Sequence, residues 1–447
     1  MYDLSAATAK LPSDFIFGVA TAAFQIEGAT HEDGRTDSIW DTFCRTPGKV
    51  KNGDTGEPAC DHYHRWPQDL DLIRELGFDA YRLSVSWARV MPEPGVINAK
   101  GLDFYVRLID GLCKRGIAPW VTLYHWDMPQ WLEDRGGWLN RESAWYFAQY
   151  AEAVGKALGN KVAGWCTLNE PFCSAYLGYR WGIHAPGRTG LANGLAAAHH
   201  LLLAHGLSVP RLREAAPDSK VGITLNFTPG YPVTPMDQGA VEVYNAENGY
   251  WFLEPLMTGH YPSIVAKLHA HAMPRILAED AAILQAPLDF LGINYYSRAL
   301  VKQSQDPDKL YDTVPAEETG GELTDIGWEI YPTGLRDLLL DLQSRYNPPP
   351  MYITENGAAC ADVLENGEVQ DEQRCRYYRH HLAAVGEALE GGADVRGYFC
   401  WSLMDNFEWA EGYSKRFGLV HVDYDTQLRT PKASAQMFAR YLKQRNR

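Results

Sequence analysis

The stretch Pro350-Met351-Tyr352-Ile353-Thr354-Glu355-Asn356-Gly357 is an apolar, β-prone run that ends on a carboxylate, and an Asn-Gly turn signal follows at once. A glutamate at the end of a buried strand is costly unless a partner stabilises it or a reaction uses it. The same design occurs upstream, where the apolar run 163–168 is followed by Asn169-Glu170-Pro171. Two such strands on a suitable scaffold would bring both glutamates to one pocket.

Short apolar runs alternate with helical patterns along the whole chain. The predicted strands are residues 15–20, 81–87, 117–124, 163–168, 221–226, 289–294, 351–355 and 395–402. The predicted helices lie near residues 67–76, 102–112, 142–158, 191–206, 238–283, 333–345 and 371–389. Because these units repeat without an obvious linker, they favour an α/β fold, a single (β/α)8 TIM barrel with elaborated βα loops that spans residues 1–447 as one catalytic domain.

Three segments lack a clear period. Residues 30–64 are rich in Gly, Asp and Thr and predict a long ordered loop, after which Pro67 predicts the first position of a helix. Residues 299–330 are polar and predict a loop with minor strands, and residues 360–370 predict a hairpin-like excursion.

Composition excludes several classes of function. The formal net charge of −15 argues against a nucleic-acid partner, and no apolar run is long enough to span a membrane. No basic and apolar leader is visible, and the eight cysteines include no CxxC pair, so we expect reduced thiols and a cytoplasmic protein. The histidines at 62, 64, 199, 200 and 205 have no cysteine or carboxylate that completes a metal-ligand pattern. Whether the chain is a monomer or a homo-oligomer stays open.

In a barrel of this kind, reactive side chains lie at the carboxyl ends of the strands. At these positions the sequence has Gln25, His125-Trp126-Asp127, Asn169-Glu170, Asn294-Tyr295-Tyr296, Glu355, Trp401 and Glu408-Trp409. Amides and carboxylates bind hydroxyl groups, and indole rings cover the C–H face of a sugar. Two glutamates in one pocket of low dielectric disfavour each other's ionisation, so one tends to stay protonated. An acid beside a carboxylate is what cleavage of a glycosidic bond needs, and their spacing separates retaining from inverting enzymes.

Several segments together resemble glycoside hydrolase family 1, the β-glucosidase family, over residues 13 to about 442. They are Asn169-Glu170-Pro171, Ile353-Thr354-Glu355-Asn356-Gly357, Phe17-Gly18-Val19-Ala20-Thr21-Ala22 with Gln25-Ile26-Glu27-Gly28, and Trp401-Ser402-Leu403-Met404-Asp405-Asn406-Phe407-Glu408-Trp409. The resemblance implies a (β/α)8 barrel that hydrolyses β-glycosides with retention, by double displacement, without a metal or organic cofactor.

The resemblance also implies a role for each matched residue. Glu170 matches the acid/base and Glu355 the nucleophile. The residues that orient the nucleophile match Arg82, Asn294 and Tyr296. The ligands of the non-reducing sugar match Gln25, His125, Asn169, Tyr296, Glu408 and Trp409, with Trp401 as stacking platform and Trp328 as an aromatic on the aglycone side.

We therefore expect a β-glucosidase with some β-galactosidase and β-fucosidase activity. Its small-molecule substrates would be cellobiose, short oligosaccharides and aryl or alkyl glucosides, as in the degradation of cellulose and other polysaccharides. Two alternatives remain, a 6-phospho-β-glycosidase and a carbohydrate-binding pseudo-enzyme. An anionic Glu408 beside the 6-hydroxyl would repel a phosphate, and the presence of both glutamates argues against lost hydrolysis. The preferred sugar and aglycone stay open.

Overall fold

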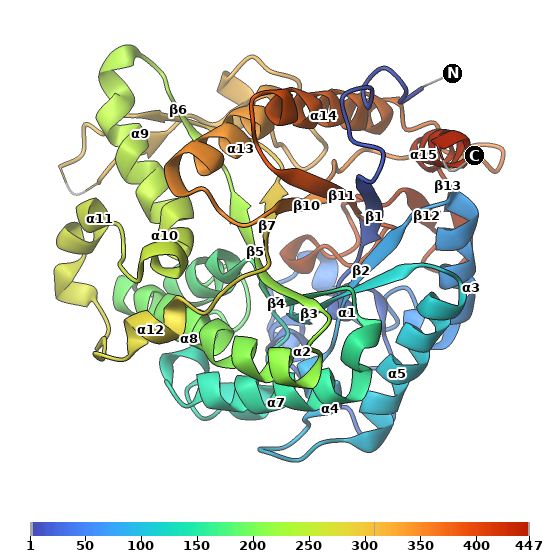
Figure 1. The fold of residues 1–447 in the computed structure, drawn as a ribbon, viewed down its shortest axis with the longest axis horizontal. Helices are drawn as coiled ribbons and strands as arrows, with labels where there is room; N and C mark the ends of the chain where they lie inside the picture. Colours follow the sequence, from blue (N-terminus) through green and yellow to red (C-terminus); the bar gives the residue numbers. More distant parts are fainter. Residues whose placement is uncertain (1–2, 308, 446–447) are drawn as a thin grey trace.

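Eight parallel strands form a closed barrel at the centre of the computed structural model, which describes residues 3–307 and 309–445 (Figure 1). The strands follow one another around the barrel in chain order. They are β1 (Ile16–Ala20), β2 (Ala80–Ser84), β3 (Ala118–Tyr124), β4 (Gly164–Asn169), β5 (Lys220–Phe227), β7 (Phe290–Tyr295), β10 (Met351–Asn356) and β11 (Val395–Trp401). The predicted (β/α)8 barrel is confirmed.

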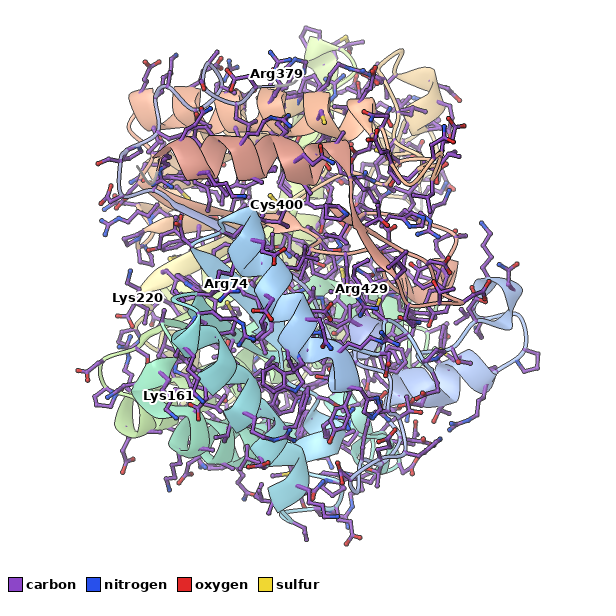
Figure 2. All side chains as sticks on the ribbon, turned by 90° about the vertical axis from the view of Figure 1, so that its right-hand side faces the viewer. Arg74, Lys161, Lys220, Arg379, Cys400 and Arg429 are labelled. Atoms are coloured by element: carbon purple, nitrogen blue, oxygen red, sulfur yellow. The ribbon has the colours of Figure 1, made fainter. Side chains whose placement is uncertain are left out.

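Helices surround the barrel on its outside (Figure 1). The longer ones are α3 (His62–Leu76), α5 (Ala99–Lys114), α7 (Ser143–Leu158), α8 (Leu191–Ala215), α13 (Pro332–Tyr346), α14 (Glu372–Glu390) and α15 (Ala433–Arg445). The shorter ones are α1 (Ala23–Ile26), α2 (Ile39–Arg45), α4 (Trp87–Val90), α6 (Gln130–Glu133), α9 (Gln238–Asn245), α10 (Trp251–Thr258), α11 (Ser263–Leu268) and α12 (Asp280–Leu284). Helices α14 and α15 lie side by side over one flank (Figure 2).

Two small sheets lie outside the barrel. One joins β6 (Gly230–Pro232), β8 (Ala299–Lys302) and β9 (Asp312–Thr313), so the minor strands expected within residues 299–330 are present. The other pairs β12 (Val420–Val422) with β13 (Arg429–Pro431). Arg429 of this second sheet, labelled in Figure 2, forms an ion pair with Asp69 of α3 and so ties the chain's last strand to an early helix.

The prediction of a loop over residues 30–64 is wrong at α2. Ser38 and Asp41 form a capping box, in which each side chain accepts a hydrogen bond from the other residue's backbone N–H, and this starts a helix that hydrophobic periodicity alone does not reveal. Pro67 is also not the first helical residue, because α3 begins five residues earlier, where the N–H groups of His64 and Arg65 donate to the carbonyl of Asp61.

Aromatic rings fill the barrel interior toward the amino ends of the strands. The Trp120 ring packs against Phe290, Tyr352 and Phe399, with centroid distances of 5.1, 4.8 and 5.4 Å. Gly18 is required beside them, since a Cβ there would lie 2.3 Å from the Phe399 ring. Packing at this end leaves the opposite end, where the strands finish, for a ligand.

Within residues 3–307 and 309–445, none of the helices is long and apolar enough to cross a membrane.

Candidate active site

A cavity of about 590 Å³ opens where the barrel strands end. Nine of the predicted site residues line it: His125, Glu170, Asn294, Tyr296, Trp328, Glu355, Trp401, Glu408 and Trp409. The other three, Gln25, Arg82 and Asn169, are fully buried and touch these lining residues instead. The structure thus brings all twelve together around one cavity, although they come from seven of the eight strands or from the segments that follow them.

Glu355, at the end of β10, is held by a cation and a phenol. Arg82 of β2 donates from Nη1 to its Oε1 at 2.7 Å, and the hydroxyl of Tyr296 donates to its Oε2 at 2.8 Å. Burial raises the pKa of the Glu355 carboxyl above its ordinary value, while Arg82 and Tyr296 oppose that rise. Because the only guanidinium in this cluster lies against Glu355, a proton shared by the two glutamates belongs on Glu170.

Glu170 follows β4 and has a backbone φ of 46°, a left-handed conformation that is costly for a residue other than glycine. Its Oε1 accepts a hydrogen bond from Asn294 Nδ2 at 2.7 Å, and its Oε2 accepts one from Cys173 Sγ at 3.2 Å. Burial, and next the negative charge of Glu355, raise the pKa of the Glu170 carboxyl to about 8. At neutral pH this carboxyl is therefore mostly protonated.

A chain of hydrogen bonds through Asn169 connects the two glutamates. Its Oδ1 accepts from Arg82 Nη2 at 2.6 Å and from Asn294 Nδ2 at 3.1 Å, and its Nδ2 donates to His125 Nε2 at 3.0 Å. Since Nε2 of His125 accepts, the ring proton is assigned to Nδ1. Burial lowers the pKa of His125 well below its ordinary value, so the ring is neutral and Nδ1 is free to donate to a ligand.

Three polar atoms of the residues matched to sugar ligands have no hydrogen-bond partner within the part of the chain that the structure describes. They are Gln25 Oε1, His125 Nδ1 and Glu408 Oε2. Buried polar atoms are normally paired, so this cluster suits a ligand that carries several hydroxyl groups. Burial, followed by the charges of Glu355 and Glu170, raises the pKa of the Glu408 carboxyl to about 8, so this side chain can donate as well as accept.

Indole rings form the walls around these polar atoms. The Trp401 ring is nearly parallel to the His125 ring, at a centroid distance of 5.7 Å and an angle of 19°. Trp409 packs on Trp126 at a centroid distance of 4.5 Å, and Trp328 packs on Tyr296 at 5.2 Å. The cavity therefore combines flat apolar faces with hydrogen-bonding groups, as a sugar site requires.

Several lining residues were not predicted from the sequence. Cys173 contacts Glu170, and the apolar side chains Leu177, Ile183, Phe227 and Ile326 line the cavity. Ile183 and Ile326 lie in loops and Cys173 and Leu177 in the π-helical segment Cys173–Arg180, so no strand end marks these four, whereas Phe227 ends β5. The position of Cys173 in the sequence did carry a signal. Where the chain turns after a strand, a residue three positions beyond Glu170 can lie next to the Glu170 side chain.

A barrel whose strand ends hold a protonated glutamate beside an ionised one defines a glycoside hydrolase that works with two carboxyl groups. Comparison with known proteins makes this specific: the model of glycosyl hydrolase family 1 matches residues 7–447, and the chain belongs to that family. The family resemblance seen in the sequence is confirmed, and with it the expectation of an enzyme.

The relatives are similar over nearly their whole length. A β-glucosidase of an Agrobacterium species is 46% identical over 446 residues, which cover 98% of this chain and 96% of the relative. A bifunctional β-D-glucosidase/β-D-fucosidase of Bifidobacterium breve is 45% identical, covering 97% of this chain and 98% of the relative. The solved structure of a β-glucosidase from Thermotoga maritima in complex with castanospermine superposes with a TM-score of 0.94 at 46% identity, covering 97% and 98% of the two chains.

Proposed function

We propose that this protein is a retaining β-glucosidase in which Glu355 is the nucleophile and Glu170 the acid/base. The observation that carries the proposal is the asymmetry of the two carboxyls: Arg82 holds Glu355 at 2.7 Å, whereas no cation pairs with Glu170 among the described residues, and its pKa is raised to about 8. One carboxyl is thereby prepared to attack and the other to donate a proton.

The reaction follows from these two states. Ionised Glu355 attacks the anomeric carbon while protonated Glu170 gives its proton to the departing glycosidic oxygen. The covalent bond consumes the charge of Glu355, so the pKa of Glu170 falls, and Glu170 can take a proton from the water that attacks next. Tyr296 and Arg82 orient the nucleophile, while Asn294 donates to Glu170 and also favours the ionised form of Glu355.

The substrates would be β-glucosides with a free non-reducing end. We assign Gln25, His125, Asn169, Glu408 and Trp409 to the hydroxyls of the terminal sugar, and Trp401 to its C–H face. Trp328 and its apolar neighbours would hold the aglycone, and cellobiose, short oligosaccharides, aryl glucosides and alkyl glucosides fit this division. One relative is named for both β-glucosidase and β-fucosidase activity, which supports a tolerant sugar site.

We further propose that residues 1–447 act as one catalytic domain. Because the eight cysteines are free thiols, we also propose that the protein works in the cytoplasm.

The structure changes the argument against a 6-phosphorylated substrate. Repulsion by Glu408 requires an ionised carboxyl, but the pKa of Glu408 is raised to about 8. The stronger objection is that Arg298 is the only arginine or lysine among the described lining residues, and it is already paired with Glu329 through two nitrogens at 2.8 and 3.0 Å. The described lining of the cavity thus offers no unpaired cation to a phosphate, so the unphosphorylated sugar is the better fit.

The decisive experiment is the Glu355→Gly variant with an activated aryl β-glucoside. We expect hydrolysis to be lost and added azide to restore turnover, giving the α-glucosyl azide, because azide attacks from the face that the carboxylate has vacated. Parental enzyme with azide is the control and should give glucose with retained β-configuration. A rescued product of β-configuration would contradict the assignment, and hydrolysis that survives the substitution would exclude Glu355 as nucleophile.

A further inference from the structure

Cys173 is a buried thiol in the cavity that the reaction scheme above does not use. It begins the π-helical segment Cys173–Arg180, its side chain lines the cavity, and the residue is 8% exposed. Its backbone N–H donates to the carbonyl of Glu170 at 2.9 Å, so the chain turns between the two residues and the thiol returns to the glutamate. Its Sγ lies 3.2 Å from Glu170 Oε2.

The contact falls on the oxygen that has to carry the acidic proton. The other oxygen, Oε1, accepts from Asn294 Nδ2 at 2.7 Å, and the orientation of the Asn294 amide is fixed because its Oδ1 accepts from the hydroxyl of Thr354 at 2.7 Å. An amide nitrogen can only donate, so the proton of the acid form cannot lie on Oε1 along that bond. It therefore resides on Oε2, beside the thiol.

A thiol suits both states of such an oxygen. When Glu170 is ionised, S–H donates weakly to the carboxylate; when Glu170 is protonated, sulfur is a weak acceptor and competes little for a proton that must reach the substrate. Burial raises the pKa of the Cys173 thiol well above its ordinary value, and the charge of Glu170 raises it further, so the group stays a neutral S–H. A hydroxyl here would bind the carboxylate more strongly, and an alkyl group would not bind it.

We propose that Cys173 is a positioning residue that sets the pH at which Glu170 loses its proton. The inference rests on the proposed acid/base role of Glu170. The competing explanation is that Cys173 is only a small apolar side chain that fills space behind the glutamate. That explanation predicts changes in stability or in both kcat and KM, and no particular direction for the pH profile.

The test compares Cys173→Ser with Cys173→Val, using an alkyl β-glucoside, whose poor leaving group needs an acid, and 2,4-dinitrophenyl β-glucoside, which does not. Serine donates more strongly to Oε2, so the apparent pKa of the basic limb in the pH profile of kcat/KM should fall by about 0.5 to 1 pH unit. Valine removes the donor, so this apparent pKa should rise by a similar amount. Both shifts should appear with the alkyl glucoside, whereas kcat/KM for the dinitrophenyl glucoside should stay within about 3-fold of the parental value.

Cys44→Ser is the matched control, because Cys44 is comparably buried, at 6% exposed, but lies in α2 outside the cavity. Its pH profile should equal that of the parental enzyme. If the basic limb of the kcat/KM pH profile stays in place, or moves in the same direction in both Cys173 variants, the inference is overturned. If instead Glu170→Gln hydrolyses the alkyl glucoside normally, the acid/base role of Glu170 has failed, which is a separate result.

Discussion

Two buried clusters of charge in this protein differ in their balance. The active-site cluster contains three carboxyls, Glu170, Glu355 and Glu408, around the single guanidinium of Arg82. A second group, which we call the ion cluster, includes residues at the starts of α14 and α15 and has equal numbers of each sign. Its members are Asp362, Asp371 and Asp405 with Arg374, Arg416 and Lys432.

The ion cluster satisfies every charge at short range. Lys432 Nζ lies 2.5 Å from Asp362 and 2.6 Å from Asp405, and Arg374 contacts Asp362 at 2.8 Å and Asp371 at 2.5 Å. Burial would raise the pKa of Asp362, but Arg374 and Lys432 outweigh it and the pKa is lowered. The cluster holds Asp405, three residues before Glu408, and thereby supports the segment that carries part of the sugar site.

The active-site cluster is left unbalanced, and its chemistry depends on that. Burial, and next the repulsion among three carboxyls that share one cation, raise the pKa values of Glu170 and Glu408 to about 8. Balance gives the ion cluster stability and inertness, whereas imbalance leaves a proton available for transfer at the cost of stability. Changes that remove the balance in one cluster, or restore it in the other, test this difference.

The largest effect on stability should follow from breaking the ion cluster. Lys432→Met leaves Asp362 and Asp405 buried with one cation fewer, and we expect a loss of about 3–5 kcal/mol in the free energy of unfolding, measured with urea. The control is Lys10→Met, whose ion pair with Glu390 is exposed and screened by solvent, so its loss should change the free energy of unfolding far less. Equal losses in the two variants would contradict the distinction.

Removing the transferable proton should disable the reaction without unfolding the protein. Glu170→Gln is expected to lower kcat/KM for alkyl β-glucosides by about 10²- to 10⁴-fold, the usual contribution of a general acid. Glycosylation by 2,4-dinitrophenyl β-glucoside, followed as the burst of dinitrophenol, should suffer far less. A burst that slows as much as alkyl glucoside hydrolysis would show that Glu170 acts otherwise than by donating a proton.

Neutralising Glu408 should stabilise the fold only at high pH. Its folded pKa of about 8 lies above the ordinary value of 4.5, so between these values the folded state keeps a proton that the unfolded state has released, and stability falls as pH rises. Glu408→Gln should therefore gain about 4 kcal/mol in unfolding free energy at pH 8 and less than about 1 kcal/mol at pH 5, while losing activity. A gain that is the same at both pH values would point to packing instead of charge.

The smallest expected effect is the loss of one donor to the nucleophile. Tyr296→Phe removes the hydroxyl that lies 2.8 Å from Glu355 Oε2, so the pKa of Glu355 should rise and the acidic limb of kcat/KM should move up by about 0.5 to 1 pH unit. Tyr295→Phe is the matched control, since the Tyr295 hydroxyl donates to the carbonyl of Tyr331 outside the cavity. An unmoved acidic limb in Tyr296→Phe would mean that the Tyr296 hydroxyl does not help to set the ionisation of Glu355.

The sequence by itself determined the barrel and the polar residues at its strand ends. Apolar runs that alternate with helical patterns are local signals, and strand ends in a barrel meet at one rim, so Glu170 and Glu355 could be placed in one pocket from their positions alone. Local signals failed where a side-chain hydrogen bond, and not periodicity, starts the element, as with Ser38 and Asp41 at α2.

Only the tertiary structure decided how the charges are distributed. Arg82 and Glu355 are separated by 273 residues in the chain and Lys432 and Asp362 by 70, and no spacing in the sequence distinguishes a carboxyl that gains a cation from one that does not. The apolar lining of the cavity and the thiol on Glu170 were also decided there, because a π-helical segment and loops place most of those side chains. A pKa depends on burial and on neighbours in space, and the fold alone sets both.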